Sequence, residues 1–317
     1  MTATVAPITL GASPLPLLPM ALGGSWYAKD AADADILAAM AASYDGGIRH
    51  FDTATGYGAG RSETLLGQFL ADKRDSVFLA SKTHSDDVSA AAMTALLEGS
   101  LKRLGTDRID LYYIHWPRTG ADLRPQMEAL ETARRQGKIG AIGVSNFSVE
   151  QMRQVAEVAP IAAHQLGYNL LWRAREADVI SYCAANGIKT IAYSALAHGI
   201  LTGKFGRDPG LVPGDQRHGI LPFRADIWPH VHAGVERLKA LAAAHDVPLA
   251  TLAVRWILAQ PNLDAVVVGA RNRAQAAANL AALEPVLPAE VFAQMDAISA
   301  EIATHVPDDG NLFGFHP

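Results

Sequence analysis

Residues 109–117 read IDLYYIHWP, and they contain the clearest strand signal of the chain. The β-branched and aromatic residues of this run are typical of a buried strand. A segment with helical periodicity, Ala90 to Leu104, precedes it, and a second apolar run, Ile139 to Ser145, follows it. This alternation predicts βα units arranged around a parallel sheet.

Similar runs recur along the chain and predict eight strands. They are Pro19 to Leu22, Arg49 to Asp52, Val77 to Lys82, Ile109 to His115, Ile139 to Ser145, Ala163 to Gln165, Ile188 to Tyr193 and Ala265 to Gly269. Helical segments lie between them, including Ala34 to Asp45, Ser62 to Ala71, Ala90 to Leu104 and Val149 to Val158. Eight such units favour an α/β fold of the closed (β/α)8 TIM barrel type over an open sheet.

The chain, residues 1–317, is predicted to form one barrel domain, because α/β barrels of about 250 residues or more commonly do so. The Gly- and Pro-rich portion from Gly203 to Pro229 is interpreted as a long loop after the seventh strand, over one end of the barrel. An extra C-terminal helix, Ala289 to Ile302, is expected after the eighth unit. The tail from Val306 to Pro317 fits either a frayed terminus or a flap over the site.

The composition excludes several classes of protein. A net charge of −5 and the absence of a run of Lys and Arg argue against a nucleic-acid partner, so we expect a small-molecule partner. The apolar segment from Ile8 to Met20 is interrupted by prolines and has no basic residue before it, so neither a signal peptide nor a membrane span is expected. The single cysteine, Cys183, excludes an intramolecular disulfide and fits a packed, inert thiol. A cytoplasmic location follows as an expectation, whereas the oligomeric state is not predicted.

Proton-handling side chains fall at three consecutive strand ends. Asp52 ends the second strand and Tyr57 follows on its loop, Lys82 ends the third strand, and His115 ends the fourth. In a barrel the C-terminal strand ends form one mouth, which is where the chemistry of such folds collects. Each residue alone also fits a structural role, as a turn carboxylate, a surface charge or a core histidine. Their joint placement favours a catalytic site.

These residue types suit the reduction of a carbonyl, whose oxygen develops negative charge as hydride arrives. Tyr57 could supply the proton, although a free phenol with a pKa of about 10 is a weak acid. We therefore expect the Lys82 ammonium to favour the tyrosinate, and Asp52 to hold Lys82 and keep it charged. His115 could hydrogen-bond the carbonyl oxygen and orient it.

Three stretches resemble the signatures of the aldo-keto reductase superfamily. They are FDTATGYG at 51–58 with its continuation through Ser62-Glu63 to Leu66-Gly67, the stretch from Leu104 through DLYYIHWP at 110–117, and GKIGAIGVSNF at 137–147. The resemblance runs from about Leu22 to Leu283. It implies that Asp52, Tyr57, Lys82 and His115 form a catalytic tetrad with the tyrosine as general acid or base. It also implies a barrel, NADP(H) as cofactor and hydride transfer without a metal.

The cofactor's nicotinamide has candidate partners at the next strand ends. Ser145, Asn146 and Gln165 offer hydroxyl and amide groups that can bind a carboxamide. The resemblance assigns them that role and implies that Tyr193 stacks on the nicotinamide ring. A strand-end tyrosine that only covers the core is the alternative.

A further segment resembles the family's pyrophosphate-binding loop. Its candidate residues are Ser194, Leu196, Gly199, Leu201 and Lys204, although Ala195 replaces the usual proline. Backbone amides and a lysine suit phosphate. Arg217 fits either closure over the cofactor or a solvated position.

The helix start after the eighth strand resembles the site for the adenosine 2′-phosphate. The candidate residues are Gly269, Arg271, Gln275 and Asn279. A helix N-terminus can receive an anion. Because Gln275 and Ala278 stand where many relatives carry Arg and Glu, NADP(H) is the first choice and NAD(H) stays open.

Substrate contacts are expected from four tryptophan and phenylalanine residues, Trp26, Trp116, Phe223 and Trp228. They suit aldehydes, ketones or sugars alike. The direction also stays open, because the same tetrad would serve an aldose or alcohol dehydrogenase working oxidatively.

Two other function classes have some support in the sequence. A metal-dependent hydrolase would use His230 and His232, but these precede an expected helix from Ala233 to His245 instead of ending a strand. A noncatalytic cofactor-binding barrel would conserve the pocket without turnover. The spacing of Gly56, Gly58 and Gly60 does not match the Gly-x-Gly-x-x-Gly fingerprint of a dinucleotide-binding turn.

Overall fold

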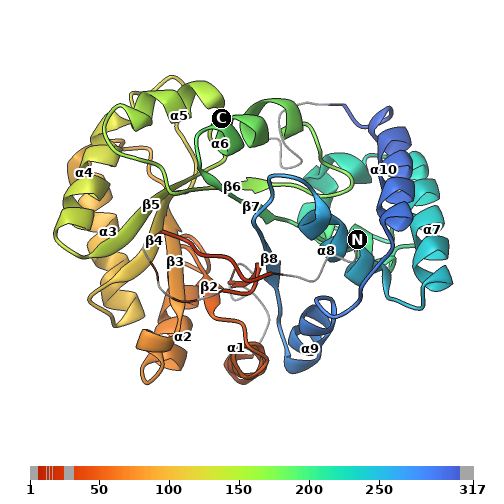
Figure 1. The fold of residues 1–317 in the computed structure, drawn as a ribbon, viewed down its shortest axis with the longest axis horizontal. Helices are drawn as coiled ribbons and strands as arrows, with labels where there is room; N and C mark the ends of the chain where they lie inside the picture. Colours follow the sequence, from red (N-terminus) through yellow and green to blue (C-terminus); the bar gives the residue numbers. More distant parts are fainter. Residues whose placement is uncertain (1–5, 12, 14, 16, 25–31, 308–317) are drawn as a thin grey trace.

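Eight parallel strands close into a barrel in chain order (Figure 1). The computed structural model describes residues 6–11, 13, 15, 17–24 and 32–307. The strands are β1 (Met20–Gly23), β2 (His50–Asp52), β3 (Phe78–Thr83), β4 (Ile109–Ile114), β5 (Ile139–Ser145), β6 (Ala163–Gly167), β7 (Lys189–Tyr193) and β8 (Ala265–Gly269). Each strand pairs with the next, and β8 pairs with β1. The predicted (β/α)8 TIM barrel is confirmed.

Helices surround the barrel (Figure 1). They are α1 (Asp33–Asp45), α2 (Arg61–Leu70), α3 (Ala90–Leu104), α4 (Arg124–Arg135), α5 (Val149–Ala156), α6 (Ser181–Ala185), α7 (Trp228–Ala244), α8 (Leu249–Ala259), α9 (Arg273–Ala281) and α10 (Ala289–Ala303). Helix α8 packs on β8, while α7 and α10 pack against each other farther out. The expected long segment after β7 and the extra C-terminal helix are therefore both present. The two phenylalanines of the tail lie outside the described residues.

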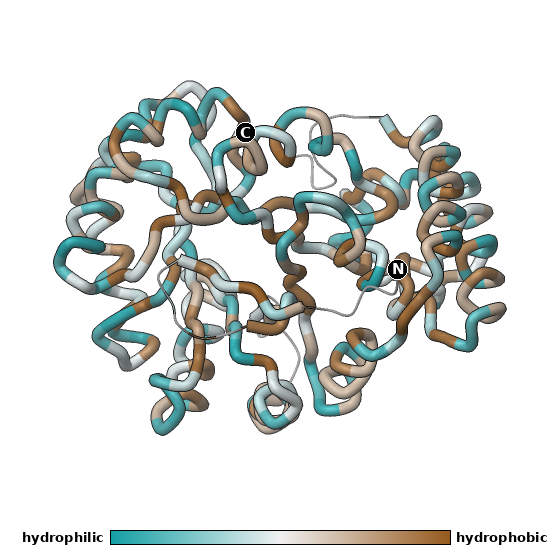
Figure 2. Tube along the Cα trace, in the orientation of Figure 1, coloured by the Kyte–Doolittle hydropathy of each residue, from teal (hydrophilic) through white to brown (hydrophobic). Residues whose placement is uncertain are grey.

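The barrel interior is filled by alternate strand residues of unequal size. Phe78, Leu111 and Tyr113 form one buried cluster with smaller residues such as Ala141. A Cβ atom on Gly143 would lie 2.3 Å from the Tyr113 ring, so this position accepts no larger residue without a shift of the ring. Brown, apolar residues of the strands lie toward the middle of the molecule, and teal residues concentrate on the surrounding helices and loops (Figure 2).

The apolar segment near the N-terminus forms the floor of the barrel. Ile8 and Leu17 make an antiparallel bridge with N–O distances of 2.8 and 2.9 Å. Leu10 and Leu17 are buried in the same cluster as the inward-facing strand residues. Within the described residues no single helix is long and apolar enough to cross a membrane, although α7 and α8, bent by 92° between them, pass that test of length and composition as a pair.

Helix α7 begins earlier than the sequence predicted. It starts at Trp228 instead of Ala233, with Pro229 in its first turn, where a proline costs no intrahelical hydrogen bond. His230 and His232 are thus helical. The His230 ring stacks on His305 with 3.6 Å between centroids. In the described part of the chain no group of three or more His, Cys, Asp or Glu residues could hold a metal ion.

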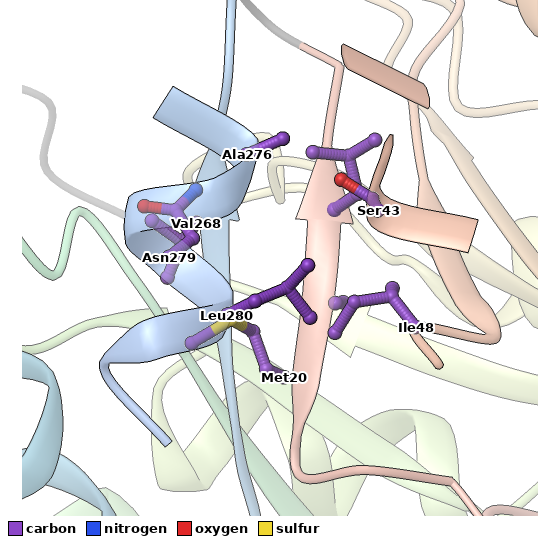
Figure 3. A pocket seen from close by; sticks show the side chains of 9 residues that line it. Met20, Ser43, Ile48, Val268, Ala276, Asn279 and Leu280 are labelled. Atoms are coloured by element: carbon purple, nitrogen blue, oxygen red, sulfur yellow. The ribbon is translucent and has the colours of Figure 1, made fainter. Parts of the chain in front are cut away.

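A small cavity lies between α1 and α9, behind β1 and β8. Figure 3 shows side chains that line it, among them Met20, Ile48 and Leu280, with Asn279 at its edge. Its volume of about 10 Å³ would hold at most one water molecule. It is a gap in the helix–barrel packing and too small for a cofactor or substrate.

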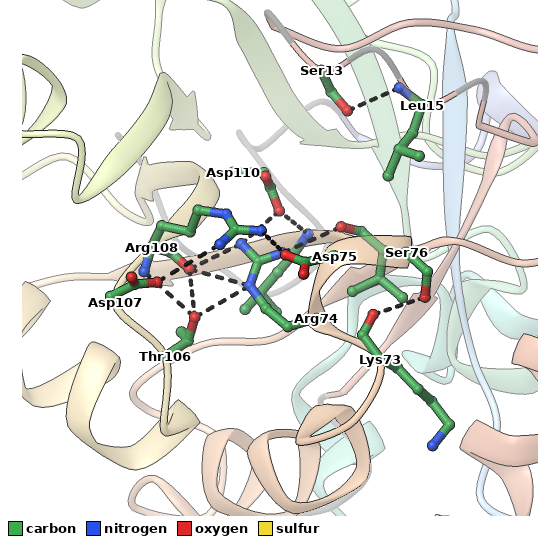
Figure 4. Close-up of polar contacts among 12 residues, drawn as sticks. Ser13, Leu15, Lys73, Arg74, Asp75, Ser76, Thr106, Asp107, Arg108 and Asp110 are labelled. Atoms are coloured by element: carbon green, nitrogen blue, oxygen red, sulfur yellow. Dashed lines mark hydrogen bonds and ion pairs between the residues drawn. The ribbon is translucent and has the colours of Figure 1, made fainter.

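Polar groups tie together the N-terminal ends of β3 and β4 (Figure 4). The Arg74 guanidinium lies 2.9 Å from Asp110 and donates to the Arg108 carbonyl oxygen. The same Asp110 carboxylate accepts the backbone N–H of Leu79 at 2.8 Å. Because the chemistry of such barrels collects at the opposite end, this cluster serves stability.

We predict that Asp110→Asn lowers the free energy of unfolding by about 1–3 kcal/mol, since it weakens two charge-assisted hydrogen bonds of a half-buried carboxylate. Urea unfolding measures the change. Asp107→Asn is the matched control, because Asp107 is exposed and lies 3.8 Å from Arg108. Equal stability of the Asp110 variant and the wild type would contradict the prediction.

Candidate active site

The structure brings the four strand-end residues together at the C-terminal mouth of the barrel. Lys82 forms an ion pair with Asp52, and both side chains are almost fully buried. The Lys82 Nζ lies 5.3 Å from the centre of the Tyr57 ring, which in turn lies 5.8 Å from the His115 ring. These groups come from β2, the loop after it, β3 and the end of β4. The four side chains therefore lie next to one another.

The loop that carries Tyr57 has an unusual backbone. Gly58, Ala59 and Gly60 have φ angles of 60°, 52° and 92°, in the left-handed region that glycine adopts most easily. At Gly60 a Cβ atom would lie 2.5 Å from the Arg103 side chain. Gly58 and Gly60, two of the glycines that do not match the dinucleotide fingerprint, thus allow the chain to turn sharply between Tyr57 and α2.

The surroundings of Tyr57 determine its pKa. Its pKa is raised above the ordinary value, first by burial and second by the charge of Asp52. The Lys82 ammonium is paired with the Asp52 carboxylate and does not lower the pKa of the resting phenol, so its expected support of the tyrosinate after proton transfer stays a prediction. At neutral pH the phenol is protonated.

His115 and Lys82 are both shifted toward their neutral forms. The pKa of His115 is well below its ordinary value because of burial, then Lys82, then His84. Burial also lowers the pKa of Lys82, while Asp52 opposes that shift. His115 Nδ1 is buried and has no hydrogen-bond partner among the described residues. A neutral imidazole with a buried nitrogen suits a hydrogen bond to a substrate oxygen.

Polar and aromatic side chains beside the tetrad are joined to it by hydrogen bonds. The Tyr193 hydroxyl donates to Asn146 Oδ1 at 2.7 Å, and Asn146 Nδ2 donates to the His115 carbonyl oxygen and to Ser145 Oγ, each at 3.1 Å. Gln165 Nε2 donates to Asp52 Oδ2 at 2.9 Å. Strand β6 continues two residues beyond Gln165, which places this amide inside the mouth. The four predicted nicotinamide partners are thus linked to the tetrad.

The residues that support Tyr193 are not apparent from the sequence. The buried Trp172 ring meets Tyr193 edge to face at 6.2 Å. A Cβ atom on Gly167 would lie 1.7 Å from the Trp172 ring, so only glycine leaves room for it. Asn169 Nδ2 donates to the Ser194 carbonyl oxygen at 3.0 Å. Nothing in the periodicity marks these contacts, because Trp172 lies on a loop beyond the strand.

The segment after β7 turns repeatedly through left-handed backbone. Ser194, Ala197, His198 and Gly199 have φ angles of 61°, 45°, 56° and 92°. The predicted residues of this loop are held by backbone hydrogen bonds from Gly199 N and Leu201 N to the Leu196 carbonyl oxygen, at 2.8 and 3.2 Å.

Cations gather next to this loop. The pKa of Lys204 is lowered by burial and then by the charges of Arg217 and Arg271. Lys204 Nζ and Arg217 Cζ lie 4.9 and 5.2 Å from the centre of the Phe205 ring, while Asp215 pairs with Arg217. Three cations near one another, with one carboxylate beside them, suit a polyanionic ligand.

The start of α9 is capped by its own residues. Asn272 Oδ1 accepts from Gln275 N at 2.9 Å, and Gln275 Oε1 accepts from Arg271 N at 2.8 Å. Asn279 Nδ2 donates to the Gly269 carbonyl oxygen at 3.2 Å. Gln275 therefore orders the backbone around Arg271.

The predicted substrate residues lie in different surroundings. The Trp116 ring stacks near His115 at 6.0 Å, beside the tetrad. Phe223 and Trp228 are buried and stack on each other at 5.2 Å, and the Phe205 ring meets both edge to face. They hold the long loop together, so their contact with substrate stays a prediction. Trp26 lies outside the described residues.

A sequence model described as the Aldo/keto reductase family matches residues 19–300. The chain belongs to this family. It is 37% identical to Aldo-keto reductase YhdN of Bacillus subtilis, over 86% of this chain and 85% of the relative.

Two other relatives differ in their described activity. The NADH-specific methylglyoxal reductase of Escherichia coli is 31% identical, over 75% of this chain and 79% of that protein. A probable voltage-gated potassium channel subunit beta from rice, Oryza sativa subsp. japonica, is 29% identical, over 82% of this chain and 86% of that protein.

Solved structures are similar along nearly the whole chain. A glycerol dehydrogenase from Gluconobacter oxydans has a TM-score of 0.87 at 31% identity, over 96% of this chain and 98% of that one. An aldo/keto reductase from Klebsiella pneumoniae, in complex with NADP and acetate, has a TM-score of 0.77 at 28% identity, over 97% and 98%. The resemblance inferred from the three sequence stretches is thus confirmed.

We predict that stability falls as the pH drops from about 6.5 to 4. Burial lowers the pKa of His50 and of His164 to about 4, so in this window the unfolded chain binds more protons than the folded one. Each histidine contributes about 3 kcal/mol of destabilisation at the acid end. His50→Leu removes one titrating group and should flatten the dependence, measured by urea unfolding between pH 7 and 4.5. An unchanged slope would refute this assignment.

Proposed function

We propose that this protein transfers a hydride between a nicotinamide cofactor and the carbonyl or alcohol carbon of a small aldehyde, ketone or sugar. The observation that carries the proposal is the buried Asp52–Lys82 ion pair next to Tyr57 and His115 at the mouth of the barrel. The family of the chain supports it. We further propose that residues 1–317 act as one domain on a small-molecule partner.

The residues present fit a nicotinamide dinucleotide. Ser145, Asn146, Gln165 and Tyr193 would hold the nicotinamide, because their amide, hydroxyl and ring groups converge beside the tetrad. The cations around Lys204 would hold the phosphates. When bound, the cofactor supplies or accepts the hydride.

The protein's own residues would handle the proton. In the reducing direction, the Tyr57 hydroxyl donates its proton to the substrate oxygen, on which negative charge develops. Lys82 stabilises the resulting phenolate, and Asp52 keeps Lys82 in place. Neutral His115 donates a hydrogen bond to the same oxygen and orients it.

The reducing direction is the first candidate, supported by the likeness to the methylglyoxal reductase. Oxidation of a polyol or other alcohol is the second candidate, favoured by the likeness to the glycerol dehydrogenase. A noncatalytic barrel is the third, since one relative is described as a channel subunit. Following nicotinamide absorbance with aldehydes, ketones, sugars and polyols separates the three.

We propose NADP(H) as the preferred cofactor and NAD(H) as the alternative. Arg271 would bind the 2′-phosphate, and Lys204, close enough for the two charges to interact, would bind the pyrophosphate. The NADP-bound Klebsiella structure supports the first choice, and the NADH-specific relative supports the second.

Tyr57→Phe should reduce turnover by about 10² to 10⁴-fold, because it removes the group that carries the proton. Cofactor affinity, followed by protein fluorescence, should stay within about twofold, since the ring is retained. Tyr44→Phe is the control: its hydroxyl bonds Ser76 on the outer side of the barrel. Retention of full turnover by the Tyr57 variant would mean that another group delivers the proton.

Arg271→Gln should weaken NADP(H) binding by about tenfold, which is the effect of losing one charge-assisted contact to a phosphate. NAD(H), which lacks that phosphate, is the internal control and should change by less than about twofold. Titration calorimetry measures both. Equal losses for the two cofactors would place Arg271 elsewhere than at the 2′-phosphate.

A further inference from the structure

Two neighbouring residues in the first turn of α2 contact the strands of the central ion pair. Ser62 Oγ lies 2.6 Å from Thr53 Oγ1, and Thr53 directly follows Asp52. Glu63 Oε1 accepts a hydrogen bond from Ser81 Oγ at 2.7 Å, and Ser81 directly precedes Lys82. All four of these side chains are buried.

The same helix turn also ends the loop that carries Tyr57. Arg103 on α3 donates from Nε to Glu63 Oε2 at 2.6 Å, and its side chain packs over Gly60 at the start of α2. Glu63 is fully buried, whereas the Arg103 side chain is about one-third exposed. A buried carboxylate is costly unless its hydrogen bonds are satisfied, and here both oxygens have partners.

We propose that Glu63 is a positioning residue for the reaction: through Ser81 and Arg103 it holds Lys82 and the Tyr57 loop in register with Asp52. This inference rests on the proposed function of the tetrad. Glu63 touches neither reacting atoms nor cofactor, and acts through the end of β3. The first turn of α2 thereby connects three tetrad members that come from separate segments.

Besides positioning these groups, Glu63 places a negative charge near Lys82. Lys82 is faced by Asp52, whose carboxylate is paired with it, by Glu63 behind β3, and by His50 and His115 inside the barrel. Because His50 and His115 are neutral, the charges that stabilise the Lys82 ammonium are those of Asp52 and Glu63. On its own side, Glu63 faces Arg103 and Tyr112 as well as Lys82.

Removing the negative charge of Glu63 therefore lowers the pKa of Lys82 further. The ammonium would then be lost at a lower pH, and the alkaline limb of the turnover profile would move in the same direction. Removing the Ser81 hydroxyl breaks the hydrogen bond from β3 to Glu63 but leaves the negative charge of Glu63 in place. Substituting Glu63 and Ser81 separately thus distinguishes the effect of position from the effect of charge.

The test compares Glu63→Gln and Ser81→Ala with the wild type. For Glu63→Gln we expect kcat to fall about tenfold at pH 7 and the alkaline limb to move to lower pH, because the variant loses a negative charge near Lys82. For Ser81→Ala we expect kcat to fall about fivefold, the effect of one hydrogen bond, with the limb unmoved. KM and the cofactor Kd, from fluorescence, should stay within about twofold for both.

Glu131→Gln on α4 is the matched control, because Glu131 is also a buried carboxylate paired with arginines but lies away from the tetrad. Thermal melting shows how far each variant is destabilised. A wild-type pH profile in Glu63→Gln, or an equal loss of kcat in Glu131→Gln at similar stability, would overturn the inference. Absence of turnover in the wild type with every carbonyl and alcohol would instead overturn the proposed function.

Discussion

The ion pair between Asp52 and Lys82 is the constraint on which the site depends. Two opposite charges that are almost entirely out of water are stable only when their geometry is good and their remaining hydrogen-bonding groups are satisfied. Lys82 also donates to the Thr53 carbonyl oxygen, and Asp52 accepts from Gln165. These partners come from β2, β3 and β6, so the pair requires the closed barrel.

The two ends of the barrel differ in composition: the floor is apolar and stabilises the fold, whereas the mouth carries the polar groups of the candidate site. At the floor, Leu10 and Leu17 extend the apolar core, and the Arg74–Asp110 cluster ties β3 to β4. At the mouth, polar groups replace apolar ones in the same inward positions of the strands. A closed floor makes the shape of the mouth rigid, which suits a site whose groups must stay within hydrogen-bond distance of a reacting atom.

In the proposed function, one part of the mouth handles the proton and the other part holds the ligand. Asn146 connects the two parts, because it accepts a hydrogen bond from the Tyr193 hydroxyl and donates one to the carbonyl oxygen of His115. Gln165 makes a second connection by donating a hydrogen bond to Asp52. Lys204 and Arg217 lie farther along the segment after β7, next to Phe205, whose ring packs against those of Phe223 and Trp228.

The sequence by itself determined the eight strands, most helix positions and which four polar residues meet at the mouth, because burial in a βα barrel leaves a local pattern of apolar runs ending in polar residues. It also marked the stretch with Ser62 and Glu63 through its resemblance to a family signature. Only the tertiary structure decided which groups these residues meet: Glu63 with Arg103, Trp172 with Tyr193, and Phe223 with Trp228. It likewise decided that Tyr57 has a raised pKa, since that shift arises from burial and from a charge on another segment. Periodicity reports whether a side chain is buried, whereas its partners lie tens of residues away and are set by the closure of the barrel.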